Sequence, residues 1–103
     1  MEVRFRNIYL EKLFQGIEIK KKPLYSEETV IGFKKAIIKI AMADNSVQLR
    51  KLKSLHFEAL KGNRQGQYSI RVNKKYRLIF TFEQTQIVIS EVVMIEELSN
   101  HYK

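Results

Sequence analysis

The amino-acid sequence predicts an α+β fold in which an N-terminal helical hairpin packs on a small, mostly antiparallel β-sheet. Apolar residues recur with a helical period up to Asn45 and with a period of two after it. The chain has 103 residues, a length that suits one domain with a modest core. Residues 1–103 are therefore expected to form a single domain.

The first half of the chain predicts a short strand and two helices. Glu2–Phe5 alternates in polarity, as a strand does. Asn7 and Ser26 are residue types that cap helix N-termini, and Gly16 suits the left-handed position at a helix end. A short connector around Pro23 predicts that the two helices form an antiparallel hairpin. Their apolar stripes are Leu10, Leu13, Phe14 and Ile17 in the first helix and Val30, Phe33, Ile37, Ile40 and Ala41 in the second.

The second half of the chain predicts strands. Apolar residues alternate with other residues in Leu55–Leu60, Tyr68–Asn73 and Tyr76–Phe82. Ile87–Val93 carries Val and Ile on both faces, which is typical of a central strand. Glu96–Lys103 is expected to be either a short terminal helix or an extended tail.

The loop between the second and third of these strands fixes their register. Only a three-residue loop, Asn73–Lys75, keeps the apolar residues of both strands on one face. That loop sets Arg71 directly opposite Arg77, and opposed like charges destabilise a sheet by up to about 1 kcal/mol. A bound anion would remove this cost. Alternatively, both guanidinium groups extend into solvent or pair with acids such as Glu91.

The positive charge of the chain is concentrated in residues 50–77. This stretch holds nine lysines and arginines against one acid, Glu58, whereas acids and bases balance elsewhere. Tyr68 and Tyr76 lie among these bases. A basic patch with aromatic residues favours a polyanionic partner, most often nucleic acid, although basic surfaces without such a partner are common.

Several functional classes are excluded by composition. Without cysteine, the chain has no disulfide framework, no zinc–thiolate site and no thiol nucleophile, which agrees with a cytoplasmic protein. No apolar run approaches the roughly 18 residues that a membrane span needs. Four glycines and one proline do not allow a glycine-rich phosphate loop to be assigned.

The sequence offers few residues for acid–base chemistry. His56 and Glu58 would share one face of one strand, but a lone strand histidine is usually structural. The polar loop Lys61–Gly66 contains glycines that permit close backbone approach, and its Lys61 and Arg64 could contact phosphate. The loop could equally be a solvated basic turn. The acid–base candidates are His56, Glu58, Lys61, Tyr68, His101 and Tyr102.

The run Leu60–Asn73, followed by Tyr76–Phe80, strongly resembles the HigB toxins of the RelE/ParE superfamily of type II toxin–antitoxin systems. The resemblance implies a RelE/ParE-like fold and a ribosome-dependent endoribonuclease that cleaves mRNA without a metal ion or other cofactor. It also implies a bacterial cytoplasmic location, no membrane partner, and neutralisation by a HigA-like helix-turn-helix antitoxin.

Site residues carry over from this family position by position. Lys61 matches the catalytic lysine, and Arg77 matches the arginine after the aromatic residue on the next strand. Glu58 stands where the family often has histidine, and the tail Asn100–Lys103 resembles the family's Asp-Tyr-His ending in type but not in order. The implied catalytic set is Lys61, Arg77, Glu58, His101 and Tyr102. The expected RNA-binding set is Arg64, Tyr68, Arg71, Lys74 and Lys75.

The roles within the catalytic set remain open. Either Glu58 or His101 could be the base, and either Tyr102 or Lys61 could be the acid or a stabilising group. Two other functions also fit the sequence: a ParE-like gyrase inhibitor without nuclease activity, and a non-catalytic RNA-binding module that stacks bases on Tyr68 and Tyr76.

Overall fold

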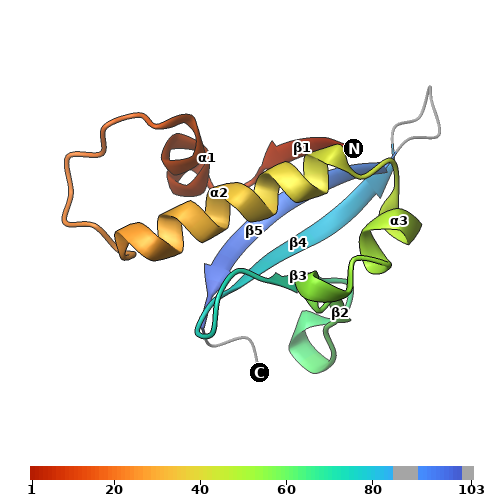
Figure 1. The fold of residues 1–103 in the computed structure, drawn as a ribbon. Helices are drawn as coiled ribbons and strands as arrows, with labels where there is room; N and C mark the ends of the chain where they lie inside the picture. The colour runs from red at the N-terminus through yellow and green to blue at the C-terminus, as the bar shows by residue number, and fades with distance from the viewer. Residues whose placement is uncertain (85–90, 101–103) are drawn as a thin grey trace.

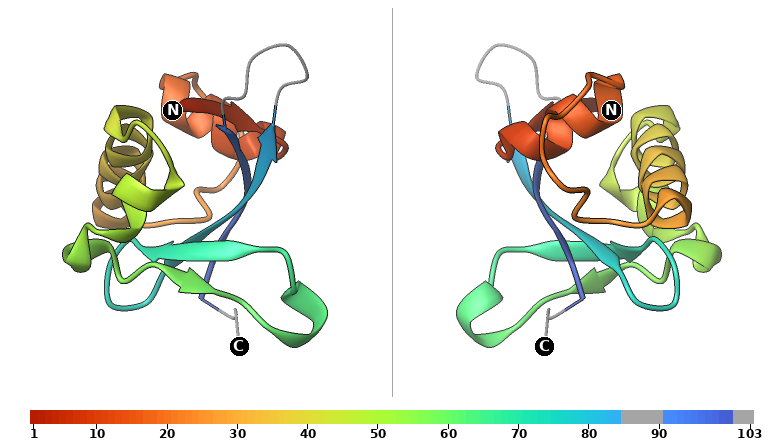
Figure 2. Two further views of the ribbon diagram at one scale, coloured as in Figure 1. Left: turned by 90° about the vertical axis from the view of Figure 1, so that its right-hand side faces the viewer. Right: turned by 90° about the vertical axis from the view of Figure 1, so that its left-hand side faces the viewer.

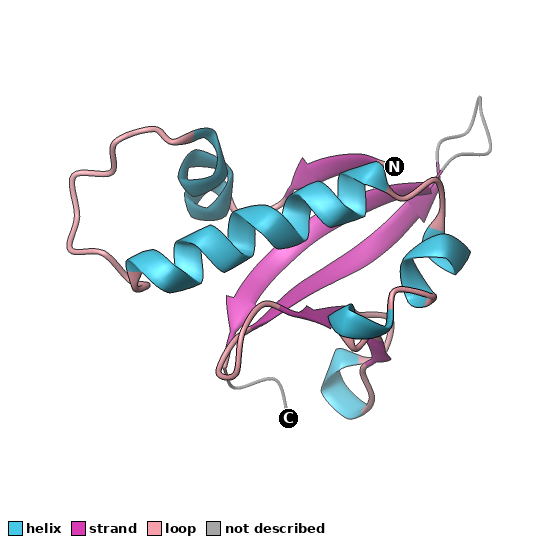
Figure 3. Cartoon of the chain, viewed as in Figure 1, coloured by secondary structure: helices cyan, strands magenta, loops and turns pink. Residues whose placement is uncertain are grey.

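A computed structural model of the protein describes residues 1–84 and 91–100, and in these residues helices cover one face of a five-stranded sheet (Figure 1). The predicted α+β class is therefore confirmed. None of the helices in the described residues is long and apolar enough to cross a membrane. The elements, shown by type in Figure 3, are β1 (Glu2–Phe5), α1 (Ile8–Gln15), α2 (Glu27–Met42), α3 (Ser46–Arg50), η1 (Lys53–Leu55), β2 (Glu58–Ala59), η2 (Gly62–Arg64), β3 (Tyr68–Arg71), β4 (Arg77–Gln84) and β5 (Glu91–Ser99).

The strands are arranged in the order β1-β5-β4-β3-β2. Only β1 and β5 are parallel, so the sheet is mostly antiparallel, as predicted. β5 lies inside the sheet, which confirms the central place expected for this part of the chain; residues 87–90 of the predicted strand lie outside the described residues. The strand continues to Ser99, so the described part of the expected terminal helix or tail is mainly β-strand.

The predicted register of the β3–β4 hairpin is confirmed. Ile70 pairs with Leu78 and Arg71 pairs with Arg77. The Asn73 side chain supports the turn, because its Oδ1 atom accepts hydrogen bonds from the backbone N–H groups of Lys75, at 2.9 Å, and of Tyr76, at 2.8 Å.

The helices begin where the sequence predicts. The Asn7 side chain accepts a hydrogen bond from Leu10 N at 3.1 Å, and Ser26 Oγ accepts one from Thr29 N at 3.1 Å. Gly16, with φ of 74°, ends α1 in the left-handed conformation. Ile17 therefore lies beyond the helix.

The two helices do not form the predicted antiparallel hairpin. Figure 1 looks along α1 but across α2, whereas Figure 2 looks across α1 and along α2, so the helices cross at a large angle. The connector, residues 16–26, is longer than expected. It is tied to the sheet by Tyr25, whose hydroxyl donates to the carbonyl oxygen of Leu98 at 2.9 Å, and burial raises the pKa of this phenol above its usual value.

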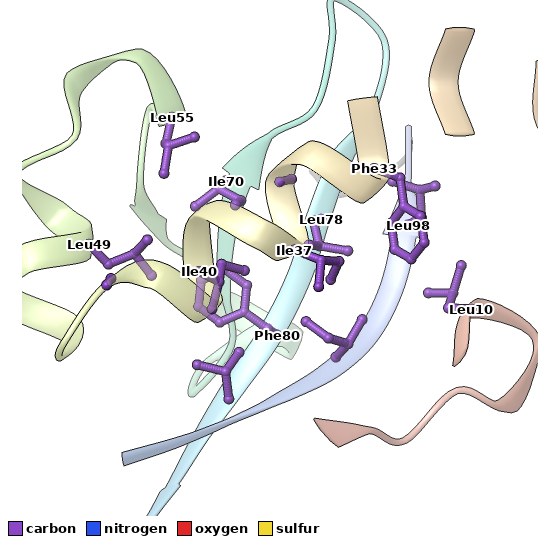
Figure 4. Packing of buried hydrophobic residues seen from close by; sticks show 14 residues of the cluster. Leu10, Phe33, Ile37, Ile40, Leu49, Leu55, Ile70, Leu78, Phe80 and Leu98 are labelled. Carbon is purple, nitrogen blue, oxygen red and sulfur yellow. The ribbon is translucent and has the colours of Figure 1, made fainter. Parts of the chain in front are cut away.

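The hydrophobic core lies between α2 and the sheet. Phe33, Ile37 and Ile40 of α2 are at most 2% exposed and belong to one cluster with Leu78 and Phe80 of β4 (Figure 4). Burial of such side chains contributes on the order of 1.5–3 kcal/mol each, so this layer holds the helix on the sheet.

The sequence prediction fails between Asn45 and Leu60. The side chain of Asn45 accepts a hydrogen bond from Gln48 N at 2.9 Å and begins α3, which buries Leu49. The expected strand is reduced to Glu58–Ala59, because His56 adopts a left-handed conformation, with φ of 48°, at the end of η1. His56 and Glu58 therefore do not share a face of one strand, as was predicted.

Candidate functional site

The sheet has an open face, which we define as the side turned away from α2. Directly opposed residues in an antiparallel ladder share a face, and the core residues Ile70 and Leu78 point toward α2, so their sequence neighbours point to the open face. Two rows of residues result: Glu58, Ser69, Ile79 and Glu97 in the first row, and Arg71, Arg77 and Ser99 in the second.

Arg77 is fixed in this face rather than exposed on it. The residue is only 9% exposed. Its Nε atom donates to Ser69 Oγ at 2.8 Å, and its Nη2 atom donates to the carbonyl oxygens of Ser69, at 3.4 Å, and of His56. The alternative that both opposed arginines extend into solvent therefore does not hold for Arg77, which lies beside an acid, Glu58, instead. The turn at His56, which the sequence did not predict, supplies one of its acceptors.

Glu58 lies beside this anchored guanidinium. Its Oε2 atom is 3.8 Å from Arg77 Nη2, and its side chain is 54% exposed. The fold thus brings together a carboxylate and a guanidinium group that the β2–β3 loop, strand β3 and the β3–β4 turn separate in the sequence. Glu91, which was considered as a partner for the arginines, instead accepts a hydrogen bond from Ser46 N at 2.8 Å, near the opposite end of β4.

Arg71 differs from its neighbour Arg77. It is exposed at the end of β3, and within residues 1–84 and 91–100 its guanidinium makes no hydrogen bond or ion pair. The open face therefore presents one accessible arginine beside one whose position is set by the protein. An accessible guanidinium can form paired hydrogen bonds with a phosphate group.

The loop between β2 and β3 crosses over the open face. It is closed by a hydrogen bond from Leu60 N to the Gln67 carbonyl oxygen at 2.9 Å. Arg64 Nη1 lies 2.9 Å from Glu97 Oε2, and Glu97 pairs with Ile79 in the sheet. This ion pair lies next to Ile79, which is fully buried although it faces away from α2. Arg64, predicted to bind RNA, is engaged by this carboxylate.

Lys61 stands at the start of this loop and lines a pocket of about 550 Å³. Its side chain is exposed and has no hydrogen bond or ion pair among the residues that the structure describes. Gly62 and Gly66 have φ of 64° and 92°, so glycine is needed here for backbone conformation. The pocket is lined by Ala59, Leu60, Lys61, Gly62, Gln65, Gly66, Gln67 and Tyr68.

The aromatic residues predicted to stack on bases pack instead against other aromatic rings of the protein. The ring of Tyr68 lies 5.1 Å from that of Phe82 and 5.6 Å from that of Phe57, on the α2 side of the sheet. Arg50, which the sequence analysis did not single out, lies over the rings of Phe57, at 5.0 Å, and Tyr68, at 5.9 Å. Tyr76 packs edge-on against the ring of Tyr25. The structure therefore does not bring Tyr68 and Tyr76 onto the open face.

The remaining predicted residues are the two lysines of the β3–β4 turn and the two residues of the C-terminal tail. Lys74 and Lys75 are exposed in the β3–β4 turn, where they line a pocket of about 370 Å³ with the N-terminus of α2. Asn73 ties this turn to α2 by donating from Nδ2 to Thr29 Oγ1 at 3.0 Å. His101 and Tyr102 lie outside the described residues, but Ser99, two positions before His101, pairs directly with Arg77.

Sequence comparison identifies the family. A family model described as the RelE-like toxin of type II toxin–antitoxin system HigB matches residues 3–93. The chain belongs to the HigB-like toxins. It is also 36% identical over 80 residues to Toxin HigB-1 of Vibrio cholerae serotype O1 (strain ATCC 39315 / El Tor Inaba N16961), an alignment that covers 78% of this chain and 82% of that protein. The predicted resemblance is thus confirmed, and membership of a type II system implies an antitoxin partner.

Solved structures show the same fold for this HigB-like toxin. A YoeB/ParE toxin from Agrobacterium tumefaciens superposes with a TM-score of 0.58 at 14% identity, covering 99% of this chain and 100% of that one. A YoeB dimer from Staphylococcus aureus gives a TM-score of 0.53 at 20% identity, with coverage of 99% and 98%. At these identities the likeness concerns the fold alone.

The matched region also limits what the family assignment says about the site. Residues 3–93 include Glu58, Lys61 and Arg77 but end before His101 and Tyr102. Ser69, whose side chain binds Arg77 in this HigB-like toxin, was missed by the sequence analysis. Ser69 occupies an ordinary polar position of the alternating strand pattern, as Arg71 does, so nothing in the sequence distinguished it.

Proposed function

We propose that this HigB-like toxin is a ribosome-dependent endoribonuclease that cleaves mRNA in the bacterial cytoplasm and uses no metal ion. The proposal rests on one observation: the exposed Arg71 lies beside the anchored Arg77, with the Glu58 carboxylate 3.8 Å from the latter. A positive charge held in place before the substrate arrives stabilises developing negative charge without reorganisation of the site.

The proposed reaction is an internal phosphoryl transfer. A base, Glu58 or His101, removes the proton of a ribose 2′-hydroxyl group, and the 2′-oxygen attacks the adjacent phosphorus. The P–O5′ bond breaks as the P–O2′ bond forms, and an acid, Tyr102 or Lys61, gives a proton to the leaving 5′-oxygen. The products are a 2′,3′-cyclic phosphate and a 5′-hydroxyl end.

Each positive residue has a separate part in this proposal. Arg71, which is exposed, contacts the non-bridging oxygens of the phosphate, and the exposed Lys61 does the same if Tyr102 is the acid. Arg77 supplies a fixed charge next to Glu58 and orients that carboxylate toward the open face. The lysines of the β3–β4 turn hold neighbouring phosphates, which positions the RNA without reading its sequence.

The test is to incubate purified toxin with ribosomes that translate a defined mRNA and to map the new 5′ ends. We expect cleavage only when ribosomes are present, at ends that require phosphorylation before ligation because they carry a hydroxyl group. RNA that binds but stays intact would indicate a non-catalytic binding module. Intact mRNA together with trapped gyrase–DNA complexes would favour the ParE-like alternative and contradict the proposal.

We further propose that the antitoxin is a HigA-like helix-turn-helix protein encoded next to the toxin. Family membership supports an antitoxin in general, and its identity is tested by co-expressing the product of the adjacent small reading frame. Restored growth and co-purification are expected. Continued growth arrest with no complex would exclude that product.

A further inference from the structure

An apolar stripe runs along the outer side of α2. Ile31, Ile38 and Met42 are 50%, 49% and 77% exposed, although the opposite side of the same helix is buried in the core. Their spacings of seven and four residues place them on one side of a helix. Nothing in this fold requires apolar residues there, because the helix already has its buried stripe.

The stripe continues past the end of α2 into a groove. This groove, of about 240 Å³, lies between the end of α2 and the α3 region and is lined by Lys39, Met42, Ala43, Gln48 and Leu52. Val47 of α3 is 60% exposed and Leu52 is 40% exposed. We call the exposed apolar residues Ile31, Ile38, Met42, Val47 and Leu52 together the α2–α3 surface. Apolar patches of this kind mark interaction sites more often than scattered apolar residues do.

Lysines border the stripe on both sides. At 100° per residue, Lys34 falls on one side of it and Lys35 and Lys39 fall on the other. Residues 29–43 contain no acid, and none of the three lysines has an acidic partner in the part of the chain that the structure describes. The acids of α2 are confined to its first turn, at Glu27 and Glu28. A partner for this surface must therefore combine an apolar stripe with flanking negative charge.

The shape of the surface fits a helix. From Ile31 to Met42 the stripe extends about 16 Å, which is three helical turns. A narrow row of apolar positions bordered by charge is how one amphipathic helix recognises another surface, through anchors three, four and seven residues apart. An extended strand would leave its backbone groups unpaired here, because the outer side of a helix offers no ladder of hydrogen-bonding groups.

We infer that the α2–α3 surface is the docking site for an acidic amphipathic helix of the antitoxin. The inference rests on the proposed pairing with an antitoxin. The exposed residues Ile31, Ile38 and Met42 lie on the side of α2 away from the sheet, whereas Arg71 and Glu58 lie on the sheet face turned away from α2. Figure 2 shows α2 on one side of the sheet. Substitutions in the α2–α3 surface should therefore affect antitoxin binding and leave the RNA site unchanged.

The experiment compares charge-introducing variants of the full-length toxin with one matched control. Ile38→Glu and Met42→Glu place a negative charge in the stripe, and the double variant Lys35→Glu/Lys39→Glu reverses the charge along one of its two borders. Ile8→Glu is the control, because Ile8 is an exposed apolar residue on α1 at 67% exposure. Affinity for the purified product of the adjacent antitoxin gene is measured by calorimetry, and unfolding midpoints confirm that each variant is folded.

We expect Ile38→Glu and Met42→Glu each to weaken binding about thirtyfold or more, as central apolar anchors do. The lysine reversal should weaken it less, by an amount that shrinks as salt is added. Ile8→Glu should bind like the parent toxin. Parental affinity in folded Ile38→Glu and Met42→Glu variants would overturn the inference, as would a parent toxin that does not bind the antitoxin.

Two further outcomes are decisive. The parent toxin could form a dimer that Ile38→Glu dissociates while antitoxin binding stays unaffected. That result would show that the surface joins two copies of this chain instead. Because binding is measured without RNA, the nuclease proposal can fail on its own: loss of binding in Ile38→Glu supports the docking site even if the parent toxin cleaves no mRNA.

Discussion

The two opposed arginines of the open face have different surroundings, although the sequence pattern treats them alike. Arg77 is held by Ser69 and by the carbonyl oxygen of His56, whereas Arg71 is exposed. A period-two pattern shows which face a residue occupies, but not whether a distant turn covers that position. The pairing of these arginines was therefore predictable, and the burial of one of them was not.

Arg71→Ala should lower activity about a hundredfold without loss of stability, because it also removes the like charge opposite Arg77. An exposed residue without partners in the described structure usually contributes less than about 0.5 kcal/mol to folding. Loss of one charge-stabilising donor typically lowers the rate on the order of a hundredfold. Cleavage rate and unfolding midpoint are measured on the same preparation. A parental cleavage rate in the folded variant would mean that the phosphate is bound elsewhere.

Arg77→Ala should reduce both activity and stability. The substitution leaves the buried Ser69 hydroxyl and the His56 carbonyl oxygen without their donor, which costs about 1–3 kcal/mol. It also removes the charge beside Glu58. Denaturant unfolding should show a lower midpoint at an unchanged slope. An Arg77→Ala protein as stable as the parent would show that these hydrogen bonds contribute little.

At the level of elements, capping and turn residues predicted the helix starts and the hairpin register correctly. The period-two pattern predicted the strands less reliably. Asn7, Ser26 and the three-residue loop were identified correctly because their effects are local. The alternation around His56 suggested a strand, but the left-handed conformation of that residue and the packing of α3 prevented one. Such departures depend on contacts between residues far apart in sequence, which a local pattern does not contain.

The end of β5 allows a test of the role proposed for His101 and Tyr102. Because Ser99 pairs with Arg77, removal of residues 101–103 alone should preserve the sheet, and we expect an unchanged circular dichroism spectrum. If His101 and Tyr102 supply the base and the acid, the truncated toxin should cut translated mRNA at least a hundredfold more slowly. Cutting at the parental rate would assign the proton transfers to Glu58 and Lys61.

Over the whole molecule, the excess charge of residues 50–77 and the apolar stripe of α2 lie in different parts of the chain, although Leu52 of the α2–α3 surface falls within the basic stretch. Residues 50–77 carry nine bases and one acid, while α2 presents its apolar stripe on the far side of the core. A long-range attraction for polyanions therefore comes from one part of the molecule. Such attraction depends steeply on salt, because binding releases counterions from the nucleic acid.

Changing Lys61, Arg71 and Lys74 together to alanine should lower the salt dependence of RNA binding. About 0.7 counterions are released per phosphate contact on single strands. The plot of log affinity against log salt should therefore become less steep by about two in this variant. The triple alanine variant of Lys20, Lys21 and Lys22 removes the same charge outside the basic stretch and should leave the slope near that of the parent. Equal reductions in both variants would indicate that net charge alone determines binding.

The parallel pairing of β1 with β5 also bears on when the toxin becomes active during its synthesis. Val3 pairs with Val93 and Phe5 with Ile95, so the first strand joins the sheet through a strand made some ninety residues later. β4, which carries Arg77, likewise depends on β5 as its neighbour. Contacts of such long sequence separation form late in folding. A ribosome that is still translating this message therefore holds a chain whose sheet cannot yet close, and the cell meets an assembled toxin only after β5 has emerged.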